Sequence, residues 1–77
     1  MTSDEFFIND VKATLGHAVA MHKPFNSHHE AYAVILEELD EYWEEVRKKR
    51  SRRDNIKMRG ELRQIAAMAI RAAVELT

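Results

Sequence analysis

The residues with the clearest chemical potential in this chain are acidic, and they occur in two short groups. Glu38 and Glu41 lie three positions apart in the first group, so on an α-helix their side chains project from the same side, one turn apart. Glu61 and Gln64 repeat that spacing in the second group. On two antiparallel neighbouring helices, the four oxygen-bearing side chains would converge. Hard divalent cations such as magnesium bind oxygen clusters of this kind, so the spacing indicates a metal site.

The two groups together resemble a known motif. The pattern EExxE at Glu37–Glu41, followed after a gap by ExxQ at Glu61–Gln64, is similar to that of the MazG-like all-α nucleoside triphosphate pyrophosphohydrolases. The resemblance covers residues 27–74. It implies a short helical bundle that assembles as a dimer or tetramer. It also implies an enzyme that uses Mg2+ to hydrolyse a nucleoside triphosphate to the monophosphate and pyrophosphate.

The same resemblance assigns roles to individual residues. The implied metal ligands are Glu38, Glu41, Glu61 and Gln64. Glu37 or Glu41 would orient or deprotonate the attacking water as the catalytic carboxylate. Lys57 and Arg53 would bind the substrate and stabilise charge on the leaving pyrophosphate. The resemblance therefore predicts a complete active site within this short chain.

Gln64 departs from the family pattern, which usually has an aspartate at this position. An amide oxygen can coordinate a cation, but it brings no charge and cannot act as a base. We therefore expect weaker metal binding than in the family, and the departure bears on turnover more than on fold. The alternative function is a catalytically inactive helical oligomer that binds nucleotides or another protein. A further alternative treats residues 37–45 as an ordinary solvated helix face, whose acids pair with the lysines one turn later.

Composition and local signals define the elements that would carry these residues. The chain has no cysteine, two glycines and one proline, which is typical of a helical domain without disulfides or thiolate metal sites. Thr2 with Glu5, and Ser27 with Glu30, have the spacing of capping boxes, and Pro24 ends the first helical segment. We expect one all-α domain over residues 1–77. Its three predicted helices cover about residues 4–21, 27–50 and 54–76.

Two apolar patterns predict how the helices pack. The second segment carries a stripe, expected in the core, of Tyr32, Ile35, Leu36, Leu39, Tyr42, Trp43 and Val46. The third segment carries another, of Met58, Leu62, Ile65, Ala66, Ala69, Ala73 and Leu76. The run from Ile65 to Ile70 has no polar residue, and three helices of one short chain cannot surround it. We therefore expect a homo-oligomer, a dimer or tetramer, built around a two-fold axis.

Charge and hydropathy limit the partners of the chain. The net charge of −1 provides no basic field for nucleic acid. Arg47–Arg53 is a basic run, but it lacks interleaved aromatic residues, so a solvated helix end is the favoured interpretation. No apolar run approaches the ~18 residues of a membrane span, and the acidic N-terminus is unlike a signal peptide. We expect a cytoplasmic protein whose partners do not include membranes or nucleic acid.

The histidines do not form an expected metal site. His17 and His22 lie five positions apart, and His28 and His29 are neighbours. Neither spacing places two side chains on one helix face. Contact with a ligand is a more plausible role for the pair at residues 28 and 29, because a helix N-terminus favours anions.

Overall fold

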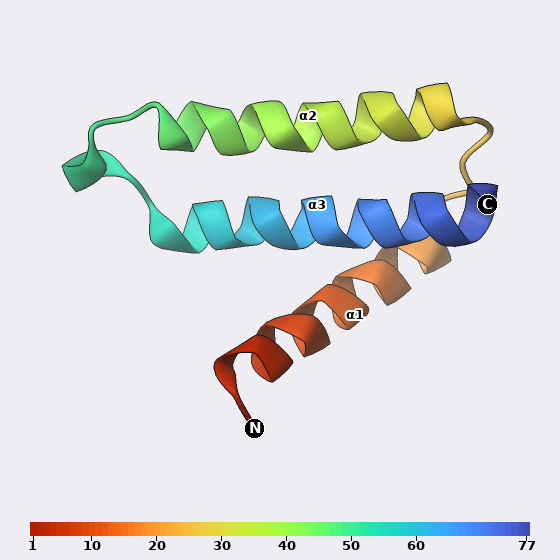
Figure 1. Cartoon of the computed structure of the whole chain (residues 1–77), viewed down its shortest axis with the longest axis horizontal. Coiled ribbons are helices and arrows are strands. Elements are labelled where there is room, and N and C mark those ends of the chain that lie inside the picture. Colours follow the sequence, from red (N-terminus) through yellow and green to blue (C-terminus); the bar gives the residue numbers. More distant parts are fainter.

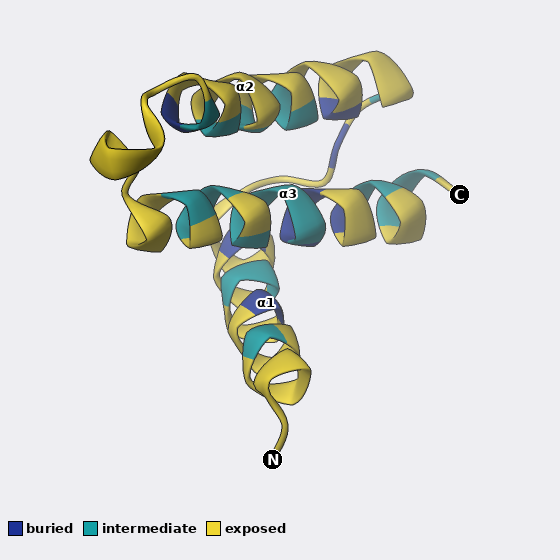
Figure 2. Ribbon diagram, turned by 60° about the vertical axis from the view of Figure 1, so that its left-hand side comes forward, coloured by how far each residue is buried: buried dark blue, intermediate teal, exposed yellow.

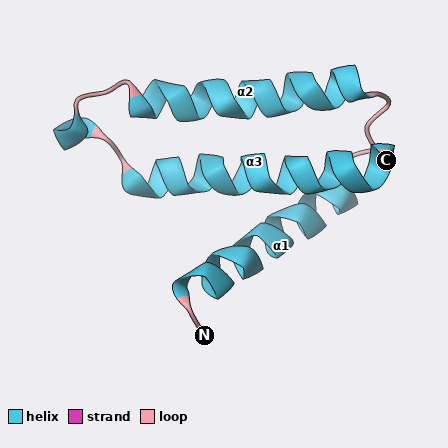
Figure 3. Cartoon of the chain, in the orientation of Figure 1, coloured by secondary structure: helices cyan, strands magenta, loops and turns pink.

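The computed structural model describes residues 1–77 and contains helices and short connections (Figure 1). The α-helices are α1 (Ser3–Met21), α2 (His28–Val46) and α3 (Asn55–Leu76), with a short 3-10 turn, η1 (Arg50–Arg52), before α3. Figure 3 shows no strand. The all-α prediction is therefore confirmed. No helix has an apolar stretch of the length needed to cross a membrane.

The helix α3 is the one on which the other two pack. α2 and α3 run antiparallel as a hairpin, and α1 crosses α3 obliquely, with its C-terminal end behind α3 in Figure 1. The C-terminal half of α1 therefore lies on one side of the hairpin, where its side chains share a cavity with those of α2 and α3. This arrangement positions the candidate site between all three helices.

Each α-helix begins at a side chain that caps it. The Thr2 hydroxyl accepts a hydrogen bond from the backbone N–H of Glu5 at 3.4 Å, and the Ser27 hydroxyl accepts one from the backbone N–H of Glu30 at 3.1 Å. The Asp54 carboxylate accepts two from the first turn of α3, at 2.9 and 3.1 Å. These bonds satisfy N–H groups that have no partner within the helix. The predicted helix starts are confirmed.

The end of α2 corrects a prediction: the helix ends at Val46 rather than near residue 50. The Arg53 guanidinium donates hydrogen bonds to the Val46 carbonyl at 3.0 Å and 2.6 Å. The Glu45 carboxylate, which is 1% exposed, accepts from Lys48 Nζ at 2.8 Å and from the backbone N–H of Asp54 at 2.7 Å. The hydrogen bond from Lys48 holds the pKa of Glu45 below its usual range. These contacts turn the chain back, so the helix cannot continue.

The hydrophobic core is small and is centred on α3. Its buried members are Val11, Ala18, Phe25, Ala31, Ala67 and Met68. Phe25 folds back from the α1–α2 connection. The Glu75 carboxylate accepts its backbone N–H at 2.8 Å, and Arg71 lies 4.2 Å above its ring centroid. Arg71 also donates to Glu75 and to the carbonyl of Lys23, so its buried charge is paired. These contacts fix the connection against the C-terminal half of α3.

The prediction that the whole apolar stripe of α2 is buried is wrong for a single chain. Ala31, Glu38 and Glu45 face inward instead, and the centre of the stripe lies about 100° around the helix from them. Its exposed members are Tyr32, Leu36, Leu39 and Trp43, with exposed fractions of 38–68%. The buried hydrogen bonds of Glu45 account for this rotation of α2, because they require its carboxylate to face the start of α3.

A matching apolar stripe on α3 is also uncovered. Ala67, Met68 and Arg71 are buried, whereas Leu62 and Ala69 are exposed. Because the helices are antiparallel, their two stripes fall on the same side of the hairpin, opposite the C-terminal half of α1. We call this side the open face, formed by Tyr32, Leu36, Leu39, Trp43, Leu62, Ala69 and Ala73. Figure 2 shows how much of both hairpin helices stays exposed.

Candidate functional site

Three of the four predicted metal ligands meet between the hairpin helices. Glu38 and Glu41 project from α2, and Glu61 projects from α3. One carboxylate oxygen of each lies within 4.8 Å of the others. Glu38 and Glu61 are half-buried, while Glu41 is exposed at the edge. The antiparallel hairpin therefore brings these carboxylates to one point, which we call the carboxylate cluster.

The electrostatics of the carboxylate cluster are unfavourable for three negative charges. Burial raises the pKa of Glu38 from 4.5 to about 7, and the neighbouring carboxylates of Glu61 and Glu41 add to the effect. The Oε2 atom of Glu61 is buried and has no hydrogen-bond partner. A buried polar atom without a partner is costly. A proton or a cation would relieve both features, and three carboxylate oxygens suit a hard divalent cation.

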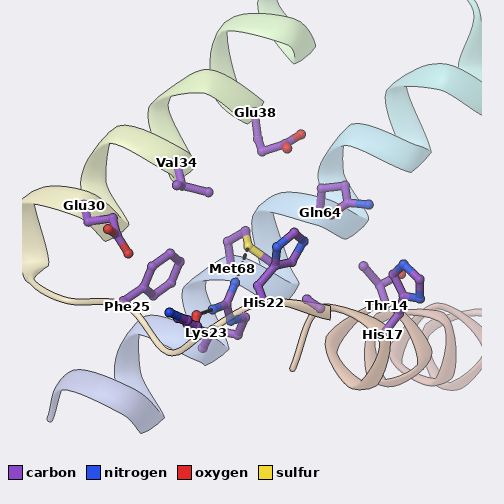
Figure 4. A pocket seen from close by; sticks show the side chains of 12 residues that line it. Thr14, His17, His22, Lys23, Phe25, Glu30, Val34, Glu38, Gln64 and Met68 are labelled. Carbon is purple, nitrogen blue, oxygen red and sulfur yellow. Dashed lines mark hydrogen bonds between the residues drawn. The ribbon is translucent and has the colours of Figure 1, made fainter. Parts of the chain in front are cut away.

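Gln64 lies one turn after Glu61 on α3 and lines a cavity of about 470 Å³ beside the cluster. Glu38 lines the same cavity from α2, so cavity and cluster adjoin. Figure 4 shows Glu38 and Gln64 projecting from facing helices at one end of the cavity. The structure therefore places Gln64 near the carboxylates, with its amide among the side chains that line the cavity.

The remaining predicted residues lie outside the carboxylate cluster. Glu37 is exposed one turn before Glu41. Lys57 is half-exposed, and its ammonium lies 3.9 Å from the Glu45 carboxylate. Arg53 caps α2 through the Val46 carbonyl. In this structure the two cations therefore contact the C-terminal end of α2, and their role in substrate binding stays a prediction.

The wall that α1 contributes to the cavity was missed by the sequence interpretation. Thr14, His17 and His22 line the cavity opposite Gln64. Thr14 and His17 lie three positions apart, so they share a helix face, and this spacing was the available signal. The spacing of His17 and His22 from each other predicted only that they do not share a metal ion. Where α1 crosses the hairpin had to be known before its polar face could be assigned to a site.

Comparisons of this chain with protein families, curated proteins and solved structures found no significant match. The geometry of the carboxylate cluster and the adjoining cavity therefore carries the functional argument.

Proposed function

We propose that this protein is a magnesium-dependent nucleoside triphosphate pyrophosphohydrolase of the MazG-like type. The observation that carries the proposal is the convergence of Glu38, Glu41 and Glu61 from two helices, with a buried oxygen of Glu61 that lacks a partner. A solvated acidic face would spread its carboxylates apart, because like charges repel. A cluster that holds them within 4.8 Å is better explained by a bound cation.

The carboxylates of the cluster and Glu37 have different proposed roles in this reaction. Glu38, Glu41 and Glu61 would hold Mg2+ through carboxylate oxygens. The bound ion would neutralise phosphate charge and polarise a phosphoryl oxygen. Glu41 is the exposed member of the cluster, so its second oxygen can orient the attacking water and accept its proton. Glu37, one turn away on the same side of α2, is the other candidate for this role.

Gln64 supports a second candidate function, a catalytically inactive oligomer that binds nucleotides. An amide at this position gives the site one negative charge fewer than the family pattern. Such a protein would keep the carboxylate cluster and the cavity but lose turnover. Measurements of binding and hydrolysis on the same preparation separate the two functions.

The open face supports assembly of two copies in either case. Tyr32 is 68% exposed and Trp43 is 57% exposed, and contiguous exposed apolar surface of this kind marks interaction sites. The stripe residues on α2 recur at spacings of four, three and four, the pattern with which helices pack face to face. Two hairpins related by a two-fold axis would bury both open faces in a four-helix arrangement. The cavity would remain uncovered, because it lies on the side of the hairpin where α1 packs.

The decisive experiment measures pyrophosphate release from a panel of nucleoside triphosphates with Mg2+. The native chain is compared with Glu38→Gln, which removes one cluster charge without changing shape. Glu44→Gln is the matched control, because Glu44 is exposed on the same helix and pairs with Arg47 at 3.4 Å outside the cluster. We expect release by the native chain and the control, with a loss of 100-fold or more in Glu38→Gln, about the effect of removing a catalytic electrostatic group. Equal release by all three proteins would refute the proposed site.

A further inference from the structure

The cavity beside the carboxylate cluster has the size and position of a second subsite. Its volume of about 470 Å³ lies within the usual range of small-molecule pockets. It is bounded by the C-terminal half of α1, the α1–α2 connection and the hairpin. Glu38 belongs both to the cavity wall and to the cluster. A nucleotide with its phosphates at the cluster therefore has this cavity next to its nucleoside portion.

The walls offer both polar partners and an apolar surface to a heterocycle. Six polar or charged side chains on the wall make no hydrogen bond to another residue of the chain: Thr14, His17, His22, Lys23, Glu38 and Gln64. Arg71 and Glu30 also line the cavity, but both are already paired, with Glu75 and Asn26 respectively. The apolar part of the wall comes from Ala18, Phe25, Val34 and Met68. Free donors and acceptors around an apolar surface suit a planar nucleobase.

Gln64 has the chemistry needed to recognise such a base. Its amide offers an acceptor oxygen and a donor nitrogen side by side, and this pair can form a bidentate contact with a base edge that presents a donor beside an acceptor. An aspartate at this position would offer only acceptors and would add charge to the cluster. The departure at residue 64 therefore matches the surroundings of the side chain in the cavity (Figure 4).

We infer that the cavity walled by Thr14, His17, His22 and Gln64 is the nucleobase subsite, and that Gln64 reads the base edge rather than ligating the metal. This inference rests on the proposed function, because it takes the phosphates of the same substrate to lie at the carboxylate cluster. It assigns the C-terminal half of α1, which carries none of the predicted metal ligands, to substrate selection.

The test compares substrates with and without a base. The kcat/KM values for the preferred nucleoside triphosphate and for abasic deoxyribose 5′-triphosphate are measured for the native chain, Gln64→Ala and Thr14→Val. We expect the ratio of the two kcat/KM values to fall about tenfold in Gln64→Ala, as for loss of one bidentate base contact. A smaller fall in the same ratio is expected for Thr14→Val. Circular dichroism confirms that each variant is folded.

The competing assignment of Gln64 as a metal ligand predicts a different pattern. Both substrates would lose the same factor in Gln64→Ala, and the Mg2+ concentration for half-maximal rate would rise. That result would overturn the inference while leaving the proposed function intact. An unchanged ratio together with an unchanged Mg2+ requirement would also overturn it.

Binding of nucleosides separates failure of the inference from failure of the proposed function. Saturable binding of a phosphate-free nucleoside, measured by NMR titration without Mg2+, is expected for the native chain and is expected to be lost in Gln64→Ala. If no triphosphate is hydrolysed but this binding is found, the enzymatic function fails and the base subsite stands. If triphosphates are hydrolysed at rates independent of the base and no nucleoside binds, the enzyme stands and the base subsite is refuted. If neither is seen, both fail.

Discussion

Replacement of Glu38 by Gln should make the metal-free protein more stable at neutral pH. The pKa of Glu38 rises from 4.5 to about 7 on folding, mainly through burial. The folded state therefore binds more protons than the unfolded state between these pH values, and stability falls as pH rises across them. At 1.36 kcal/mol per pKa unit the full penalty is about 3 kcal/mol. Because Glu38 is half-buried rather than enclosed, solvent screening reduces the expected value to about 1–2 kcal/mol.

The assay is urea unfolding followed by far-UV circular dichroism at a fixed protein concentration, without Mg2+, at pH 4.5 and pH 7.5. We expect Glu38→Gln to exceed the native chain in free energy of unfolding by about 1–2 kcal/mol at pH 7.5. The difference in free energy of unfolding should shrink at pH 4.5. At this pH, Glu38 is about half protonated in the unfolded chain and almost fully protonated in the folded chain. Glu44 is exposed and lies outside the cluster. The free energy of unfolding of Glu44→Gln should therefore differ from that of the native chain by about the same amount at both pH values.

Addition of Mg2+ should reverse the order of stability. A ligand at 100 times its dissociation constant stabilises the folded state by about 2.7 kcal/mol, and the native chain should gain more of this than Glu38→Gln. A native chain that is the more stable of the two at pH 7.5 without metal would refute the electrostatic reasoning. Equal stabilisation of both proteins by Mg2+ would show that Glu38 does not hold the ion.

Two further predictions concern assembly and the helix start. Trp43→Lys places a charge on the open face, which is the proposed dimer interface. The variant should be monomeric in light scattering after size exclusion and should keep the helical circular dichroism of the native chain. An oligomer that persists in the variant would show that the open face is not the interface. Ser27→Ala removes the cap of α2 and should lower the free energy of unfolding by about 1 kcal/mol, measured by urea unfolding. No change would indicate that Asn26 or water replaces the cap.

The parts of the fold that depend on nearby residues could be predicted from the sequence. The caps at Thr2, Ser27 and Asp54 involve N–H groups two or three positions away, so spacing alone reveals them. The spacing of the glutamates also predicts that Glu38 and Glu61 converge on antiparallel neighbouring helices. A short connection between them makes that arrangement the simplest one.

The rotation of α2 and the placement of α1 could not be predicted in the same way. Hydrophobic periodicity favoured burial of Trp43, but Glu45 is buried instead, because it accepts the backbone N–H of Asp54 nine positions later. No pattern in the neighbouring sequence predicts that hydrogen bond. The buried Val11 and Ala18 show which face of α1 packs against the core. They do not determine the angle at which α1 crosses α3. The cavity depends on that angle, so its polar wall emerged only from the structure.

Residue 64 lies where the proposed metal site adjoins the proposed base subsite. Burial and the neighbouring carboxylates of Glu61 and Glu41 already raise the pKa of Glu38 to about 7, so an added charge in Gln64→Asp would destabilise the metal-free cluster and strengthen its attraction for Mg2+. We expect Gln64→Asp to lower the Mg2+ concentration for half-maximal rate about tenfold, equivalent to one pKa unit of interaction energy. Loss of the amide donor should at the same time reduce discrimination among bases. Tighter Mg2+ binding with unaltered base preference would mean that residue 64 faces the ion and not the base.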